Sequence, residues 1–104
     1  MAITNIIQGS AITVGATPQK LFATNTRGRL AYRVYVPKTS TVSVMVMALP
    51  VGTAAPNQAT VLADADFCVS AGTTLEDAVS EAYDIWIVSE SATTVVVKGK
   101  EILP

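Results

Sequence analysis

The sequence predicts an all-β fold in one domain, a jelly-roll-like β-sandwich or a small barrel of about seven to eight short antiparallel strands. Apolar and polar residues alternate at a period of two through most of the chain, which is the period of a β-strand. Turn-forming Gly, Pro, Asn and Ser separate the alternating segments at short intervals. The length of 104 residues fits a single β domain over 1–104, with 1–10 as a candidate N-terminal arm.

The first strands are short and end at turn-forming residues. Residues 11–14 predict a strand that closes at Gly15, and residues 20–23 predict a second one. A third strand covers 29–36, where the even-numbered apolar residues from Leu30 onward share one face because successive side chains point to opposite sides.

The strand predicted at 41–49 is apolar on both faces near its end. Val44 lies on one face, and Met45 and Met47 lie on the other. A strand of this kind is normally covered on both faces.

The second half of the chain predicts a long connection and then the remaining strands. Residues 50–58 are rich in Pro, Gly and Ala, and their length suits a crossing from one sheet to the other. A strand is expected around 67–69. Residues 75–80 predict either a short helix or an extended arm, because a capped start is followed by only about one turn of helical support. Two final strands are expected at 83–89 and 93–98, joined by a hairpin.

The composition indicates burial by partner subunits. Half of the residues are hydrophobic and only 14% are charged, whereas ordinary soluble domains have roughly 25% charged residues. One small core cannot hide this surplus of apolar groups. We therefore expect a homo-oligomer.

The usual residues of catalysis are missing. The chain has no histidine and one cysteine, Cys68, which has no base beside it and no disulfide partner. Cys68 is therefore expected as a small buried residue in a strand. With no phosphate loop and no paired cysteines either, the sequence predicts no catalytic residue, no cofactor and no metal site, and hence a protein that is not an enzyme.

Two residue pairs have alternative interpretations. Asp64 and Asp66 are expected on one strand face, where they can help to hold calcium or act as acid and base. A solvated start of a strand explains them more simply. Trp86 with Tyr83 can form a sugar-binding platform, although a tryptophan among Ile and Val is more often in a core or a subunit interface.

Charged residues are segregated along the chain. A basic segment precedes an acidic segment. The two segments can be neighbours in the fold that neutralise each other, or they can lie on different edges, so that the basic edge of one subunit meets the acidic edge of another. Nucleic-acid binding through Arg27, Arg29 and Arg33 is disfavoured by the acidic overall balance. The basic segment contains Lys20, Arg27, Arg29, Arg33 and Lys38, and the acidic segment contains Asp64, Asp66, Glu76, Asp77, Glu81, Asp84 and Glu90.

No membrane or export segment is expected. Residues 1–10 lack a basic start and carry polar residues where a signal peptide needs an apolar core. The longest apolar stretch, 44–49, is far below the ~20 residues that span a bilayer. Synthesis in a cytoplasm is therefore expected.

Several segments together resemble a known class of proteins. Residues Ile12–Leu21, the turn at Asn25–Leu30, the turn at Val69–Glu76 and the strand at Ala82–Ile87 resemble small β-sandwich structural proteins of tailed bacteriophage virions. The resemblance covers roughly residues 10–103. It implies a role as head decoration or cement, head-to-tail connector or fibre component, commonly as a multimer.

The expected function is that of a non-enzymatic virion structural protein, a capsid decoration or cement subunit located in the virion. Its expected partners are further copies of itself, as a trimer, and the major capsid protein or other virion proteins, with no nucleic acid and no membrane. The alternatives are a receptor- or glycan-binding tip or fibre module and a head–tail connector component. The candidate interface residues are Arg27, Arg29, Arg33, Val44, Met45, Met47, Asp64, Asp66, Glu76 and Asp77.

Overall fold

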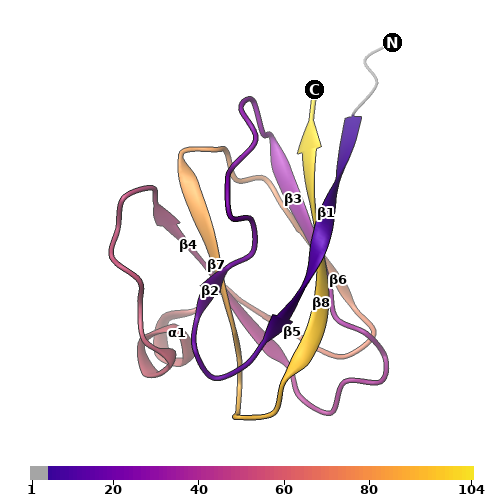
Figure 1. The fold of residues 1–104 in the computed structure, drawn as a ribbon, viewed down its shortest axis with the longest axis vertical. Coiled ribbons are helices and arrows are strands. Elements are labelled where there is room, and N and C mark those ends of the chain that lie inside the picture. The colour runs from indigo at the N-terminus through magenta and orange to yellow at the C-terminus, as the bar shows by residue number, and fades with distance from the viewer. Residues whose placement is uncertain (1–4) are drawn as a thin grey trace.

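Two four-stranded antiparallel sheets face each other in the computed structural model, which describes residues 5–104 (Figure 1). The first sheet has the order β1 (Asn5–Val14), β8 (Val95–Leu103), β3 (Ala31–Tyr35), β6 (Thr74–Asp77). The second has the order β2 (Gln19–Lys20), β7 (Tyr83–Ser89), β4 (Val44–Pro50), β5 (Phe67–Val69). The predicted all-β, sandwich-like fold is confirmed.

The core lies between the sheets and follows the predicted alternation. Along β3, the side chains of Tyr32 and Val34 are buried, while Arg33 and Tyr35 face outward and are partly exposed. Leu30 does not share the inner face as predicted, because it precedes β3 and is 54% exposed. The cluster comprises Val14, Leu21, Phe22, Tyr32, Val34, Val36, Val44, Val46, Val69, Ile85, Ile87, Val95 and Val97.

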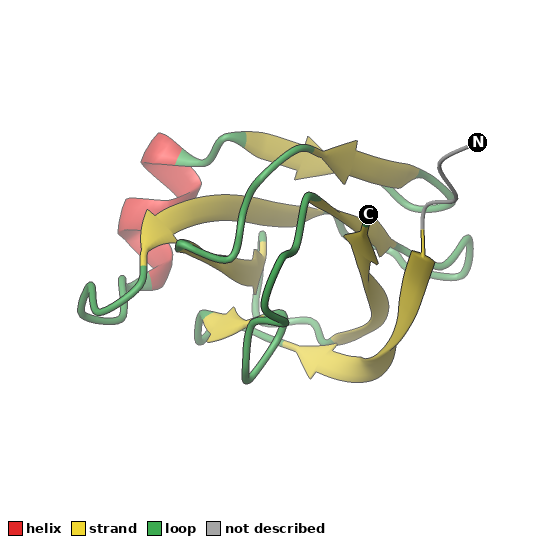
Figure 2. Ribbon diagram, turned by 90° about the horizontal axis from the view of Figure 1, so that it is seen from above, coloured by secondary structure: helices red, strands yellow, loops and turns green. Residues whose placement is uncertain are grey.

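A second apolar layer lies outside the second sheet, as the two-sided pattern of β4 predicts. On this outer face Met45 pairs with Val88 and Met47 pairs with Trp86. The cover is the short helix α1 (Gln58–Asp64), which packs against β4 and buries Val61 completely (Figure 2). The chain itself therefore covers part of the apolar surface that the composition assigned to partner subunits.

The connection after β4 does not cross between the sheets. It leads into α1, a helix that the sequence did not predict, and the chain then returns to β5, which pairs with β4 in the same sheet. The helix starts at Asn57, whose side-chain oxygen accepts a hydrogen bond from the Thr60 N–H at 2.8 Å. This cap supports a helix of only seven residues, which needs the packing of Val61 to persist.

For residues 75–80 the extended alternative is the right one. Residues 74–77 form β6, in which Leu75 pairs with Val34 of β3 and is partly buried against the core. Pairing with a neighbouring strand outweighs a helical signal of about one turn.

Cys68 lies in a strand, as predicted, but it is exposed rather than buried. Strand β5 is an edge strand, and its inward position is taken by Val69, which is buried. The alternation places Cys68 on the opposite face.

The N-terminal arm prediction is also revised, because β1 begins at Asn5 and pairs with β8. Residues 1–4 lie outside the part described.

Candidate functional site

Arg29 is buried, with 2% of its surface exposed, and every guanidinium hydrogen has an acceptor. The acceptors come from the turn before β3, the loop before β7 together with the first residue of β7, and the end of β8. The Nε atom donates to Val79 O at 3.0 Å. The Nη2 atom donates to Ser80 O at 2.6 Å and to Tyr83 O at 2.7 Å. The Nη1 atom donates to Asn25 Oδ1 at 2.9 Å and to Glu101 Oε2 at 3.3 Å. Arg29 therefore joins three parts of one subunit and cannot contact another, which corrects its placement among the interface residues.

The carboxylate of Glu101 completes this buried network. It accepts hydrogen bonds from the Thr26 N–H at 2.9 Å and the Thr26 hydroxyl at 2.6 Å, in addition to Arg29. A buried charge persists only when it is paired and hydrogen-bonded, and both charges here are. The sequence indicated no role for Glu101, because its partners are separated from it by more than 70 positions.

Two more ion pairs connect the basic segment with the acidic segment inside one subunit. Lys20 Nζ lies 3.4 Å from Asp84 Oδ2, and Arg33 Nε donates to Glu76 Oε1. The Asp84 Oδ2 atom, which has no hydrogen bond of ordinary geometry, therefore still has a cationic partner. These contacts support mutual neutralisation of the two segments within the fold.

The two aspartates are not a pair on one strand face. Asp64 ends α1, and Asp66 follows it, so they flank the end of a helix. Asp66 Oδ2 accepts a hydrogen bond from the Ala48 N–H at 2.9 Å. This bond satisfies a backbone donor of β4 that lies past the end of the pairing with β5. In the described part of the chain, no cluster of three or more metal-ligating His, Cys, Asp or Glu side chains occurs.

The other charged candidates take separate places. Arg27 and Asp64 are exposed, while Asp77 is partly buried opposite Tyr32 in the β3–β6 ladder. Burial raises the pKa of the Tyr32 phenol well above its usual value, and the carboxylates of Asp77 and Asp66 raise it further. Tyr32 therefore stays neutral in the folded core.

The predicted sugar-binding platform is not available. Trp86 is 6% exposed and lies in the outer apolar layer opposite Met47, so the alternative placement in a packed core is the right one. Lys20 covers it, with Nζ 5.8 Å from the ring centroid. A ring that is covered in this way has no face for a sugar.

The apolar interface candidates are also occupied within the subunit. Val44 is fully buried in the core, so it cannot contact another subunit. Met45 and Met47 are partly buried in the layer beneath α1. The prediction of an interface on β4 is therefore corrected for Val44.

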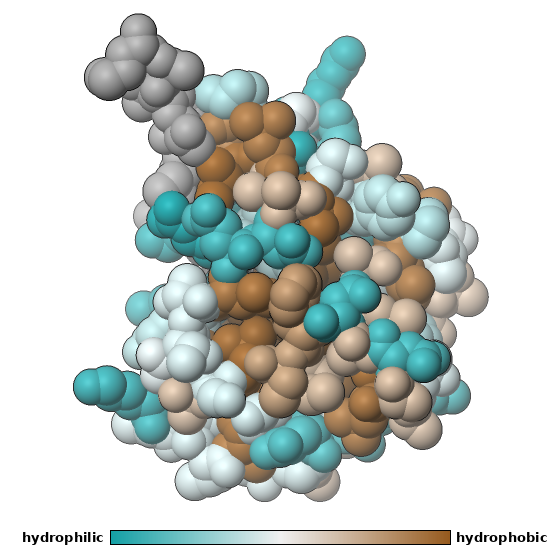
Figure 3. All heavy atoms as spheres, turned by 180° about the vertical axis from the view of Figure 1, so that it is seen from behind, coloured by the Kyte–Doolittle hydropathy of each residue, from teal (hydrophilic) through white to brown (hydrophobic). Residues whose placement is uncertain are grey.

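Apolar groups line the space between β4 and the loop after β6, where Ala48 and Val79 are partly buried and Tyr83 is exposed. A depression of about 340 Å³ lies here, lined by Ala48, Val79 and Tyr83 among others. Phe67 pairs with Val46, two residues before Ala48 on the same face, and is 37% exposed. Figure 3 shows apolar side chains in a broken stripe on the rear of the molecule. We call Ala48, Phe67, Val79 and Tyr83 the open side.

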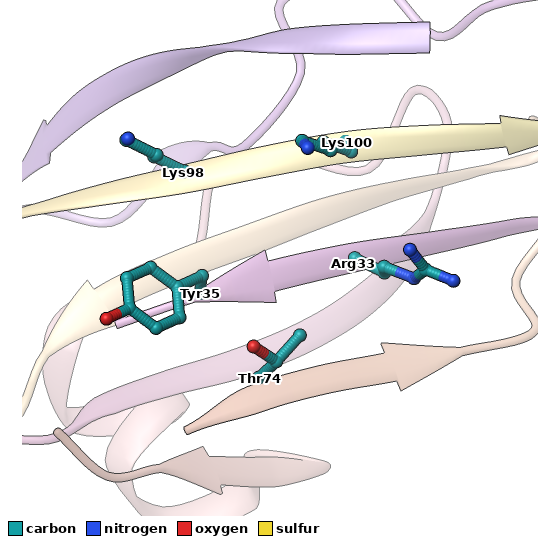
Figure 4. Close-up of a pocket in the computed structure, with 5 residues that line it drawn as sticks. All are labelled: Arg33, Tyr35, Thr74, Lys98 and Lys100. Atoms are coloured by element: carbon teal, nitrogen blue, oxygen red, sulfur yellow. The ribbon is translucent and has the colours of Figure 1, made fainter. Parts of the chain in front are cut away.

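A basic groove lies on the outer face of the first sheet (Figure 4). It has a volume of about 290 Å³. Its lining residues come from three neighbouring strands: Arg33 and Tyr35 from β3, Thr74 from β6, and Lys98 and Lys100 from β8. Of these, only Arg33 is among the interface residues that the sequence predicts. Lys98 lies on the outward face of the strand predicted at 93–98, whereas Lys100 lies beyond that predicted strand, and the register of both with Arg33 was not predictable.

Comparison of the chain with protein-family models, curated proteins and solved structures finds no match. Within residues 5–104, no helix is long and apolar enough to cross a membrane.

Proposed function

We propose that this protein is a non-enzymatic structural subunit of a tailed-bacteriophage virion, a capsid decoration or cement protein that works as a homo-oligomer. The open side is the observation that carries the proposal. Ala48, Val79 and Tyr83 line one depression, Phe67 lies on the strand β5 that borders β4, and Phe67 and Tyr83 are each more than a third exposed. Contiguous exposed apolar surface marks protein–protein contact sites.

The fold supports an adhesive role. Two four-stranded sheets and a fully satisfied buried ion pair stabilise the subunit, and its loops and the outer face of the first sheet remain for contacts. The segments that resemble virion proteins include the turn at Asn25–Leu30, and this turn is anchored through Arg29 and Glu101.

The experiment that tests this function is co-sedimentation of the purified protein with phage heads that lack it. A cement subunit should bind expanded heads, bind unexpanded heads poorly, and raise the temperature at which expanded heads rupture. The physical reason is mass action, since a ligand that binds only the intact shell stabilises the intact shell.

Binding at the neck only, with heads equally heat-stable, would replace the cement role by the connector role. Absence of binding to any part of the particle would reject the virion function altogether.

A further inference from the structure

The basic groove concentrates positive charge on a protein whose net charge is −1. In the antiparallel pairing of β3 with β8, Arg33 stands directly opposite Lys100, and Tyr35 stands opposite Lys98. Like charges directly opposite each other destabilise a sheet. The arrangement therefore has an electrostatic cost that a bound anion would remove.

The protein offsets only part of that cost itself. On the far side of Arg33, Glu76 of β6 accepts a hydrogen bond from its Nε. Lys98 and Lys100 are exposed and form no ion pair with any side chain that the structure describes. Two ammonium groups on adjacent outward positions of one strand thus remain without a carboxylate.

The neutral lining narrows the ligand class. The partly exposed ring of Tyr35 lies between the strand that carries Lys98 and the strand that carries Thr74 (Figure 4). One aromatic face, two hydroxyls and three cationic side chains, of which only Arg33 is paired with a carboxylate, therefore meet in one shallow groove. A ligand that matches them has an apolar ring face, hydroxyl groups and a negative charge on one small scaffold.

Other anionic ligands fit less well. The backbone of β3 is paired on both sides, so an extended acidic peptide could pair only with the free edge of β6, where Glu76 and Asp77 would repel it. A nucleic acid strand is typically held by several aromatic platforms, and the groove offers one. Inorganic phosphate uses the cations and leaves the Tyr35 ring without a role.

We propose that the basic groove binds a carboxylated sugar, with the carboxylate at Lys98 and Lys100, the apolar ring face on Tyr35, and hydroxyls at Thr74 and the Tyr35 phenol. This site is separate from the buried Trp86. The proposal goes beyond the virion function and stands or falls independently of it, since it concerns a face of the isolated subunit.

The test is a titration of the full chain with a galacturonic acid trisaccharide. Amide chemical shifts and calorimetry measure the binding. The neutral control ligand is the same trisaccharide as its methyl ester, which keeps the rings and removes the charges. We expect shifts confined to β3, β6 and β8, saturable binding of the acid, and at least about tenfold weaker binding of the ester, because two exposed charge contacts together are worth about that factor.

Matched variants locate the site. The double variant Lys98→Gln/Lys100→Gln should lose about tenfold in affinity, and Tyr35→Ala should weaken binding of the acid while leaving the charge unchanged. Lys38→Gln removes an exposed cation that does not line the groove and should bind like the wild type.

Three results would overturn the proposal. These are equal binding of acid and ester, tighter binding of inorganic phosphate or of a thymidine oligonucleotide than of the trisaccharide, and no saturable shift in the groove at millimolar ligand. None of them bears on attachment to phage heads, so failure here is distinguishable from failure of the virion function.

Discussion

Arg29 shows how a single residue can look functional in a sequence and be structural in the fold. It sits in a run of cations next to a glycine turn, and such a run normally belongs to a solvated or binding surface. In the structure its five N–H groups meet three backbone carbonyls, an amide oxygen and a carboxylate. Only the planar fork of an arginine fits that set of acceptors, because lysine offers three donors from a single point.

Replacement of Arg29 by methionine should destabilise the protein by about 3–5 kcal/mol, because it leaves the Glu101 carboxylate buried without its cation. Equilibrium urea unfolding measures the loss. The second change Glu101→Leu should recover part of it, since removal of both charges of a buried pair costs less than removal of one.

The control is Arg27→Ala, which removes an exposed cation two positions away and should change stability by no more than about 0.5 kcal/mol. An Arg29→Met protein as stable as the wild type would show that the network contributes nothing to the fold.

At the scale of elements, the alternating strands were predictable and their pairing was not. The period of two identified β3, β4, β7 and β8, because each has one face in the core. Helix α1 was not predicted because it has only seven residues and one fully buried side chain. Helical periodicity cannot be recognised from a single buried position. The basic groove escaped for a different reason. Arg33 and Lys100 are brought together by the β3–β8 register, and no local pattern encodes a pairing between strands so far apart.

Helix α1 itself provides a matched pair of substitutions. Val61→Ala removes a fully buried side chain from the outer apolar layer and should cost about 1.5–3 kcal/mol, from lost apolar burial and the cavity that remains. Leu62→Ala, on the adjacent exposed position of the same helix, should cost about 0.5 kcal/mol.

Both costs are obtained from the same urea titration. Equal effects of the two substitutions would mean that α1 does not pack on β4 as described.

At the scale of the whole molecule, the sandwich protects its sheets unequally. The edge strands β5 and β6 are short, and β6 carries acidic side chains, features by which proteins discourage strand-to-strand association. The open side between these edges has no such protection, since its members are Ala48, Phe67, Val79 and Tyr83. Side-chain packing at the open side, rather than extension of a sheet, is therefore the expected mode of contact between copies.

The oligomer should accordingly depend on the open side and not on other exposed apolar residues. Phe67→Glu places a charge among the contact groups and should shift the protein from oligomer to monomer at micromolar concentration, as measured by native mass spectrometry. Val96→Glu makes the same chemical change at a residue that is 49% exposed on the outer face of β8, and it should leave the oligomer intact. Tyr83→Glu repeats the test at a residue that lines the depression itself, and circular dichroism reports whether each variant keeps its β-structure. A wild-type protein that is monomeric under these conditions, or a Phe67→Glu variant that folds and still assembles, would remove the open side as the contact surface.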